Sequence, residues 1–206
     1  DAFPEITDFL IRTSKKWNID LRWLANFDVL KCCQSHLGNT VKVKDLNERN
    51  QAELKRIGFE EDSFTFEAES YAGNHLMKTV VLNQFIEKNN IKALFMALRR
   101  DEQAARKHDE YFTKKEGGYL MPEHTRISPI LHFTERDIWN NIKLHNIPYC
   151  LLYEIGYRSL GARTNSNPMA VGVPAWEQNL EHTPERAGRR QDKEKTMDRL
   201  RKLGYM

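Results

Sequence analysis

A pair of arginines follows an apolar run in the middle of the chain and could bind a small anion. Arg99 and Arg100 come directly after this run, and Asp101 behind them can cap a helix. Two guanidinium groups beside a helix N-terminus suit a phosphate or sulfate group, because arginine donates paired hydrogen bonds to such oxygens. A helix cap with a surface cluster of ion pairs explains the same residues about equally well.

A second candidate anion site is the segment Tyr153–Gly161. Gly156 and Gly161 let the backbone approach a ligand closely, and Arg158 and Ser159 supply hydrogen-bond donors. A plain turn explains the two glycines, but it does not explain the arginine together with the aromatic side chains. We therefore keep Arg158 and Ser159 as candidate binding residues.

A third basic segment, Glu185–Arg190, carries Arg186 and Arg189. Taken alone, this segment is typical of a solvated basic tail. It becomes a candidate anion site only in combination with the other two segments.

The three cysteines argue against a metal centre and against disulfides. This odd, low number is typical of a reducing compartment. A structural zinc ion needs four ligands and an iron–sulfur cluster usually four cysteines, so we expect neither. Cys32 and Cys33 could begin a metal site with His36, but two buried structural thiols are the favoured interpretation.

The overall composition favours a small globular protein that acts on small molecules. The 206 residues suit one domain with at most a small appendage. With 32 basic and 29 acidic residues the net charge is only +3, which is too small to indicate duplex nucleic acid as a partner. No apolar run approaches the roughly 20 residues of a membrane helix. We expect a cytoplasmic protein.

The elements that must position these side chains alternate between helices and strands. Helices are expected from Pro4 and after the Thr134 capping box, and over Asn47–Ile57, Asn74–Lys88, Glu102–Phe112 and Glu194–Leu203. Strands are expected over Leu21–Ala25, Ile91–Leu98 and Ile127–Phe133. This alternation predicts an α/β fold, with a mostly parallel sheet covered by helices on both faces.

The predicted sheet places the arginine pair where ligands bind in such folds. Ligands of parallel sheets lie beyond the carboxyl ends of the strands, and Arg99 and Arg100 follow Ile91–Leu98 directly. Arg126 differs, because it stands at the start of its strand. The Gly-, Pro- and Asn-rich stretch Tyr149–Glu177 is interpreted as a long functional loop outside the core.

Several segments together resemble one enzyme family. ALRRDEQAAR (Ala97–Arg106), RISPILHFTERDIW (Arg126–Trp139) and IPYCLLYEIGYRSLG (Ile147–Gly161) are similar to motifs of PAPS reductases and of the small subunit of bacterial ATP sulfurylase. HLMKTVVL (His75–Leu82) also fits, with Val81 where the family has proline. The segment Glu185–Met206 is closer to the ATP sulfurylase subunit. The resemblance covers nearly the whole chain in order and spacing.

The resemblance implies an adenine-nucleotide α-hydrolase-like fold that binds ATP, APS or PAPS as substrate. Mg²⁺ is compatible with this, because nucleotide phosphates usually bring one, and the three cysteines predict no iron–sulfur cluster. It implies a nucleotide-binding domain over residues 1–148 and a substrate-covering loop and tail over 149–206. It assigns no catalytic residue. The residues expected around phosphate or sulfate are Lys78, Arg99, Arg100, Arg126, Arg158, Ser159, Arg186 and Arg189.

The sequence departs from the family pattern in two ways. The family's Ser-Gly-Gly-x-Asp-Ser phosphate loop is not found, so we expect this chain to lack the first strand and that loop. The Cys-containing tail of PAPS reductases is also not found, and three cysteines cannot supply the four of a cluster-bearing APS reductase.

Three functions remain open at this stage. The first is adenylyl transfer from ATP to sulfate or a similar acceptor. The second is reduction of PAPS, which the family favours and the missing cysteine tail opposes. The third is a nucleotide-binding or subunit-interaction module without catalysis. A homo-oligomer or a partner subunit is compatible with all three.

Overall fold

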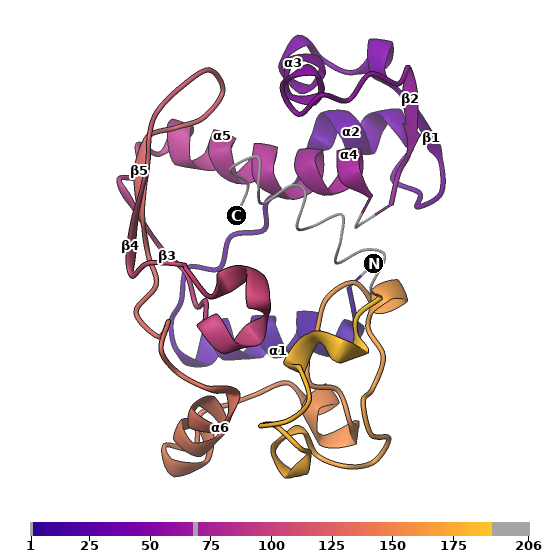
Figure 1. Cartoon of the computed structure of the whole chain (residues 1–206). Helices are drawn as coiled ribbons and strands as arrows, with labels where there is room; N and C mark the ends of the chain where they lie inside the picture. The colour runs from indigo at the N-terminus through magenta and orange to yellow at the C-terminus, as the bar shows by residue number, and fades with distance from the viewer. Residues whose placement is uncertain (1, 68–69, 191–206) are drawn as a thin grey trace. The chain divides into compact units, whose positions relative to one another are not determined.

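The computed structural model describes residues 2–67 and 70–190, and the chain divides into two compact units (Figure 1). One unit contains residues 23–92 and 114–124. Within the described residues, the other contains residues up to Arg22, residues 93–113 and residues 125–190. The functional boundary expected after residue 148 stays a prediction, and the helix expected at Glu194–Leu203 lies outside the described residues.

The first unit is a small helical layer with a two-stranded antiparallel sheet. Strands β1 (Thr40–Lys42) and β2 (Ser63–Thr65) pair with Val41 opposite Phe64. The helical elements are α2 (Phe27–Cys32), the 3₁₀ turn η1 (Val43–Asp45), α3 (Glu48–Arg56), α4 (Tyr71–Asn74), the π-helix η2 (His75–Val80) and α5 (Val81–Lys88).

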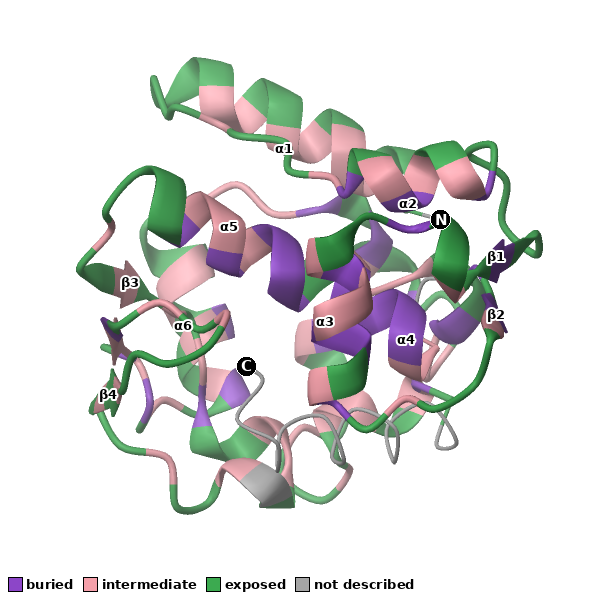
Figure 2. Ribbon diagram, turned by 90° about the horizontal axis from the view of Figure 1, so that it is seen from above, coloured by how far each residue is buried: buried purple, intermediate pink, exposed green. Residues whose placement is uncertain are grey.

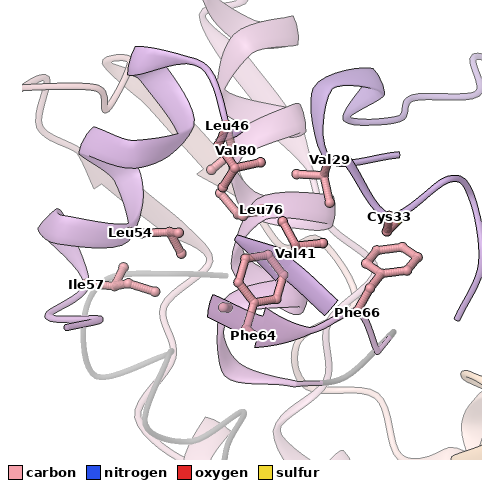
Figure 3. Close-up of a cluster of buried hydrophobic side chains, with 11 residues drawn as sticks. Val29, Cys33, Val41, Leu46, Leu54, Ile57, Phe64, Phe66, Leu76 and Val80 are labelled. Atoms are coloured by element: carbon pink, nitrogen blue, oxygen red, sulfur yellow. The ribbon is translucent and has the colours of Figure 1, made fainter. Parts of the chain in front are cut away.

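The core of this unit forms where α2, α3 and the π-helix pack against β1 and β2 (Figure 3). Val29, Val41, Leu76 and Val80 are fully buried, and Leu54 is nearly so. Figure 2 shows in purple how the buried residues gather on one side of α3 and along α4 and α5. Burying an aliphatic side chain of this size contributes about 1.5–3 kcal/mol, so this cluster is the main stabilising element of the unit.

Helix α3 follows the sequence prediction closely. Asn47 accepts a hydrogen bond from the Asn50 backbone at 2.9 Å and so caps the helix N-terminus. Gly58 adopts a φ of 69°, the left-handed conformation that ends helices at little cost only for glycine. The prediction of a helix over Asn47–Ile57 is confirmed.

The predicted helix Asn74–Lys88 is also confirmed as helical, but it begins earlier and changes type. Ser70 caps it by accepting a hydrogen bond from the Gly73 backbone at 3.1 Å. The middle turn, His75–Val80, is π-helical before α5 continues. Hydrophobic periodicity cannot reveal such a widened turn, because the π-bulge depends on contacts of the neighbouring elements.

The second unit joins a helix, a short sheet and a long series of turns. Helix α1 covers Pro4–Lys16, and the three-stranded sheet has the order β3-β5-β4, with β3 and β5 parallel. The remaining elements are β3 (Ala93–Phe95), β4 (Phe112–Lys115), β5 (His124–Ile127), α6 (Glu135–Leu144) and the 3₁₀ turns η3 (Arg100–Glu102), η4 (Ala104–Arg106), η5 (Leu151–Ile155), η6 (Arg163–Asn165), η7 (Ala175–Glu177) and η8 (Glu185–Gly188).

The strand predictions are only partly correct. Ile91–Leu98 contains β3, but this strand is three residues long and lies at the edge of the described sheet, with Phe95 71% exposed. A buried central strand was therefore the wrong prediction. The strand expected at Ile127–Phe133 lies earlier, at β5, and Leu21–Ala25 is not a strand. Short apolar runs do not fix strand position, because pairing partners decide it.

The helix expected over Glu102–Phe112 is replaced by η3, η4 and the start of β4. Asp101 does not cap a helix of its own. Its carboxylate accepts hydrogen bonds from the Arg99 side chain at 3.1 Å and from the Glu135 backbone at 2.6 Å. Long-range polar contacts thus override the local helical pattern in this segment.

Helix α6 confirms the predicted capping box and anchors an aromatic cluster. Thr134 accepts from the Asp137 backbone at 3.1 Å, and the Asp137 carboxylate accepts from the Thr134 backbone at 2.8 Å. The Trp139 ring packs edge-on against Tyr153, and its centroid lies 5.1 Å from the centroid of the Trp176 ring. Leu152 and Ala175 are buried, so the interpretation of residues 149–177 as a loop outside the core is wrong. No helix within the described residues is long and apolar enough to cross a membrane.

Candidate functional site

Arg126 lies on the central strand of the three-stranded sheet and is partly withdrawn from water. It pairs in register with Leu94 of β3. Its side chain is half-buried, and its Nε has no hydrogen-bond partner among the described residues. Burial lowers the pKa of Arg126, while the nearby charge of Asp109 acts in the opposite direction. A desolvated guanidinium of this kind is stabilised when an anion reaches it.

Arg100 holds the backbone that carries Asp109. Its Nε and Nη2 donate to the Asp109 carbonyl oxygen at 3.2 and 2.9 Å. The Arg100 backbone N–H donates to the Leu131 carbonyl at 3.0 Å, which ties this segment to the loop after β5. The exposed Arg100 side chain thus fixes the position of Asp109, whose charge acts on Arg126.

Tyr111 stands beside Arg100 and connects it to His132. The Arg100 guanidinium lies 5.5 Å from the centre of the Tyr111 ring, within cation–π range. The Tyr111 hydroxyl lies 3.0 Å from His132 Nδ1, and the Ser128 N–H donates to the Tyr111 carbonyl at 2.8 Å. We define the Arg126 cluster as Arg100, Asp109, Tyr111, Arg126 and His132.

Sequence reasoning assigned Arg100 and Arg126 to the site but missed the other three members of the cluster. The helix expected over Glu102–Phe112, which would contain Tyr111, does not form, and no motif singles out His132. The turn after β5 brings His132 back to Tyr111, and no local sequence pattern signals this contact.

Arg99 points into a different environment from that of Arg100. Its side chain is 7% exposed, and it donates from Nε to Asp101 at 3.1 Å and from Nη2 to Glu185. Its backbone N–H donates to the Glu102 carboxylate at 3.2 Å. The expectation that Arg99 and Arg100 both follow a central strand and face one cleft is not met, because acidic residues hold Arg99 in the interior.

Arg158 is a buried structural residue in this fold. It is 2% exposed, and its Nε and Nη2 donate to the two carboxylate oxygens of Glu135 at 3.1 and 2.5 Å. It also donates to the Thr183 hydroxyl at 2.5 Å and to the Thr183 carbonyl at 3.0 Å. The chain itself therefore occupies this candidate binding residue, and its acidic partner is Glu135.

Ser159 and Arg189 connect the 153–167 loop to the 185–190 segment. Arg189 donates from Nε to the Ser159 hydroxyl at 3.0 Å and from Nη2 to the Leu160 carbonyl. Gly161 lets the Arg189 guanidinium approach the backbone, because a Cβ at this position would lie 1.7 Å from a guanidinium nitrogen and the arginine would have to shift. Arg186 lies half-buried in η8, one turn before Arg189. The structure therefore joins the two segments that the sequence grouped together.

Lys78 belongs to the other unit, where it stands exposed on the π-helix. Its neighbour His75 is fully buried and lies 3.1 Å from the Glu53 carboxylate, and burial lowers the pKa of His75. Glu53 is fully buried too and also pairs with Arg56 at 2.6 Å. His75 is thus an interior residue.

Burial disfavours the thiolate form of Cys32 and Cys150. Cys150 is 4% exposed, and burial raises its pKa. Burial also raises the pKa of Cys32, helped by the charges of Asp28 and Asp45. Cys32, Cys33 and Cys150 form no disulfide. Across residues 2–67 and 70–190 no three His, Cys, Asp or Glu side chains gather in a way that could hold a metal ion.

A hollow of about 960 Å³ lies in the unit formed by residues 23–92, beside α3 and β2. Its walls mix the lysines Lys42, Lys44 and Lys55 with Glu60 and Asp62. None of the arginines discussed above lines it. Its balanced charges offer no preference for an anion. We therefore place the candidate site at the Arg126 cluster.

Comparison with known proteins gives one family match over most of the chain. The sequence pattern of the family described as "Phosphoadenosine phosphosulfate reductase domain" matches residues 25–168. This segment includes β3, β5, α6 and all members of the Arg126 cluster.

Curated relatives carry two kinds of enzyme name. A phosphoadenosine 5'-phosphosulfate reductase of Xylella fastidiosa is 31% identical over 100 residues, which cover 48% of this chain and 40% of the relative. Sulfate adenylyltransferase subunit 2 of Brucella anthropi is 30% identical over 158 residues, which cover 62% of this chain and 52% of the relative. The chain spans about half or less of the length of these relatives.

Solved structures support the fold. The Candida glabrata FMN adenylyltransferase in complex with FMN and an ATP analogue aligns with a TM-score of 0.59 at 16% identity, covering 92% of this chain and 66% of that one. Yeast FAD synthetase aligns with a TM-score of 0.54 at 16% identity, covering 92% and 64%. At this identity the likeness concerns the fold alone, and it confirms the predicted α/β class.

Proposed function

The chain belongs to the phosphoadenosine phosphosulfate reductase family, and from this premise we propose that it binds an adenine nucleotide and transfers AMP from ATP to sulfate. The observation that carries this proposal is Arg126, a half-buried guanidinium whose Nε has no partner among the described residues. The phosphate or sulfate oxygens of the substrates would supply the missing acceptors.

The proposed reaction makes clear demands on the site. A sulfate oxygen attacks the α-phosphorus of ATP, the bond to the bridging oxygen of the β-phosphate breaks, and pyrophosphate leaves. Negative charge gathers on the phosphoryl oxygens during this step, and fixed cationic donors stabilise it. In our proposal Arg126 binds one such oxygen, while Arg100 and Asp109 keep the position of the guanidinium. Arg158 and Arg189 serve the fold, since the chain itself occupies their guanidinium groups.

A Mg²⁺ ion bound to the nucleotide would neutralise part of the charge of the leaving pyrophosphate. The described residues contain no group of three carboxylate, histidine or cysteine ligands for such an ion. The phosphates of the substrate would therefore supply most of its ligands.

Reduction of PAPS or APS is the second candidate, because relatives from Xylella fastidiosa and Bacillus subtilis are named as these reductases. A thiol-based reduction needs a thiolate, since the thiolate is the nucleophilic form of cysteine. Burial raises the pKa of both Cys32 and Cys150, which disfavours the thiolate at either position. This observation supports adenylyl transfer over reduction by these cysteines. A nucleotide-binding module that works with a partner subunit is the third candidate, and the subunit name of the Brucella anthropi relative favours it.

One experiment separates the three candidates. The protein is incubated with ATP, sulfate and Mg²⁺, and pyrophosphate release is measured. In parallel it is incubated with PAPS or APS and a thiol reductant, and sulfite is measured. Sulfate-dependent pyrophosphate release supports adenylyl transfer, and sulfite formation supports the reductase. Nucleotide binding in calorimetry without either product supports the binding module.

A further inference from the structure

The carboxylate of Glu185 occupies a position at Arg99 that resembles that of a bound anion. Glu185 opens the 3₁₀ turn η8, and its carboxylate pairs with Arg99 Nη2. The side chains of Glu185 and Arg99 are 19% and 7% exposed, so the pair is mostly shielded from water. A carboxylate and a sulfate or phosphate group present similar oxygen acceptors to a guanidinium.

The surroundings of Glu185 are strongly acidic. Three acids face it, namely Asp101 and Glu102 from η3 and Glu135 from α6. Arg99, in the segment before η3, is the basic group that faces it. Tyr153 of η5 also lies within range of its charge. The charge of Glu135 is in turn paired with Arg158.

The balance of these effects leaves Glu185 close to its titration midpoint at neutral pH. Burial is the largest cause and raises its pKa, and Glu135, Glu102 and Asp101 add to the rise, while Arg99 opposes it. The resulting pKa of Glu185 is about 7. A small change in pH therefore shifts the carboxylate between an ionised form that competes for Arg99 and a neutral form that competes weakly.

The chain on both sides of Glu185 is held independently of Arg99. Thr183 accepts from Arg158 through its hydroxyl at 2.5 Å and its carbonyl at 3.0 Å. Arg189 is bound to Ser159 at 3.0 Å and to the Leu160 carbonyl. Release of the Glu185 carboxylate therefore moves one side chain and leaves η8 attached at both ends.

We propose that Glu185 is an internal competitor for an oxyanion at Arg99: the ionised carboxylate occupies the guanidinium, and its protonation or displacement opens the guanidinium to a sulfate or nucleotide phosphate group. The inference rests on the proposed function for the identity of the anion. The site itself is defined by Arg99, Asp101 and Glu185.

The direct test measures the affinity of sulfate for the protein at several pH values. Sulfate keeps its double negative charge from pH 6 to pH 8, so the anion itself adds no pH dependence. If binding requires neutral Glu185, the competent fraction falls from about nine tenths at pH 6 to about one tenth at pH 8, for a midpoint near 7. The apparent dissociation constant for sulfate should then rise about tenfold between these pH values.

The variant Glu185→Gln keeps the size of the side chain and removes the titration. It should bind sulfate with nearly the same affinity at pH 6 and pH 8, and about tenfold more tightly than the wild type at pH 8. Glu177→Gln, which changes an exposed acid in η7, should behave like the wild type. The histidines His132 and His182 remain in both variants, so a contribution from histidine titration would survive in Glu185→Gln.

The outcomes are decisive because sulfate binding needs no nucleotide and no turnover. If the sulfate affinity of Glu185→Gln depends on pH as strongly as that of the wild type, the proposed role of Glu185 as a competitor is overturned. Weaker sulfate binding by Glu185→Gln than by the wild type at pH 8 also overturns it. Circular dichroism melts of each variant confirm that the protein is folded, and Glu185→Ala provides a second neutral variant. If pH-dependent sulfate binding is found but neither pyrophosphate nor sulfite is formed, the proposed function fails while the competitor stands.

Discussion

Neighbouring arginines in this chain have opposite surroundings, and this difference decides whether an internal carboxylate competes with a ligand for the guanidinium. Arg99 and Arg100 are adjacent in the sequence, yet acids hold Arg99 in the interior while Arg100 binds a backbone carbonyl at the surface. Arg158 is buried on Glu135, whereas Arg126 keeps a buried Nε without a partner among the described residues. The number of arginines is therefore a poor guide to an anion site, and the distribution of their partners is a better one.

Replacement of Arg158 should affect stability far more than ligand binding. Arg158→Ala would leave the Glu135 carboxylate buried without its partner, which typically costs about 3–5 kcal/mol of unfolding free energy. Chemical denaturation of the variant and of Arg12→Ala, an exposed arginine on α1, measures the difference. Unchanged stability together with a loss of nucleotide affinity would contradict the structural role of Arg158.

The stability of the protein should also report the titration of Glu185. Its folded pKa of about 7 lies above the value of 4.5 expected in the unfolded chain, so the folded state binds the proton more tightly. Stability is therefore lost as the pH rises from about 4.5 to about 7, by up to about 3 kcal/mol for a shift of this size. Glu185→Gln carries no titrating group and escapes this loss. In thermal melts, the melting temperature of Glu185→Gln relative to that of the wild type should be higher at pH 8 than at pH 5. A difference in melting temperature that is the same at both pH values would contradict the raised pKa of Glu185.

At the scale of elements, helix ends were predicted better than strands. The caps at Asn47 and Thr134 and the glycine at position 58 depend on short-range contacts, which a local sequence pattern contains. The strands β3 and β5 are only three and four residues long, and their positions depend on each other. The segment from Arg100 to Arg106 forms 3₁₀ turns because Asp101 and Glu102 bond to distant or backbone partners, which no helical pattern can reveal.

The start of the α4 helix makes a sharp prediction about packing. A Cβ at Gly73 would lie 2.4 Å from the Glu67 carbonyl oxygen, which belongs to the backbone and cannot easily move. Gly73→Ala should therefore lower the unfolding free energy by about 1–3 kcal/mol. Gly118→Ala is the matched control, because its Cβ would make only an ordinary contact of 3.6 Å with a methionine side chain. Equal stabilities of the two variants would show that the turn before α4 adapts.

Loss of the cap on α6 should have a smaller and local effect. Thr134→Ala removes the acceptor for the Asp137 backbone N–H, and such cap losses typically cost about 1 kcal/mol. Thr164→Ala, a change in the turn η6, serves as a comparison outside a helix cap. A denaturation midpoint for Thr134→Ala equal to that of the wild type would contradict the importance of the capping box.

At the scale of the whole molecule, the family and the α/β class were predictable from the sequence, and the site was predictable only in part. The motifs around Arg99, Arg126 and Arg158 are recognisable because their order and spacing persist along the chain. Arg158 pairs with Glu135, Arg99 pairs with Glu185, and the charge of Asp109 acts on Arg126. These acids lie between 17 and 86 residues away from their arginines along the chain. Local sequence contains no measure of such pairings, so the structure was needed to separate the arginines that the chain itself occupies from Arg126, whose Nε has no partner among the described residues.

The central claim is that Arg126 provides the anion contact for an adenine nucleotide, and one titration tests it directly. Calorimetric titration of ATP into the wild type, Arg126→Gln and the charge-matched control Arg12→Gln compares the three affinities at constant salt. We predict that Arg126→Gln weakens ATP binding by about 1.5–3 kcal/mol, the scale of a hydrogen bond to a charged group, while Arg12→Gln binds like the wild type. Equal ATP affinities of the wild type and a folded Arg126→Gln protein would contradict the claim.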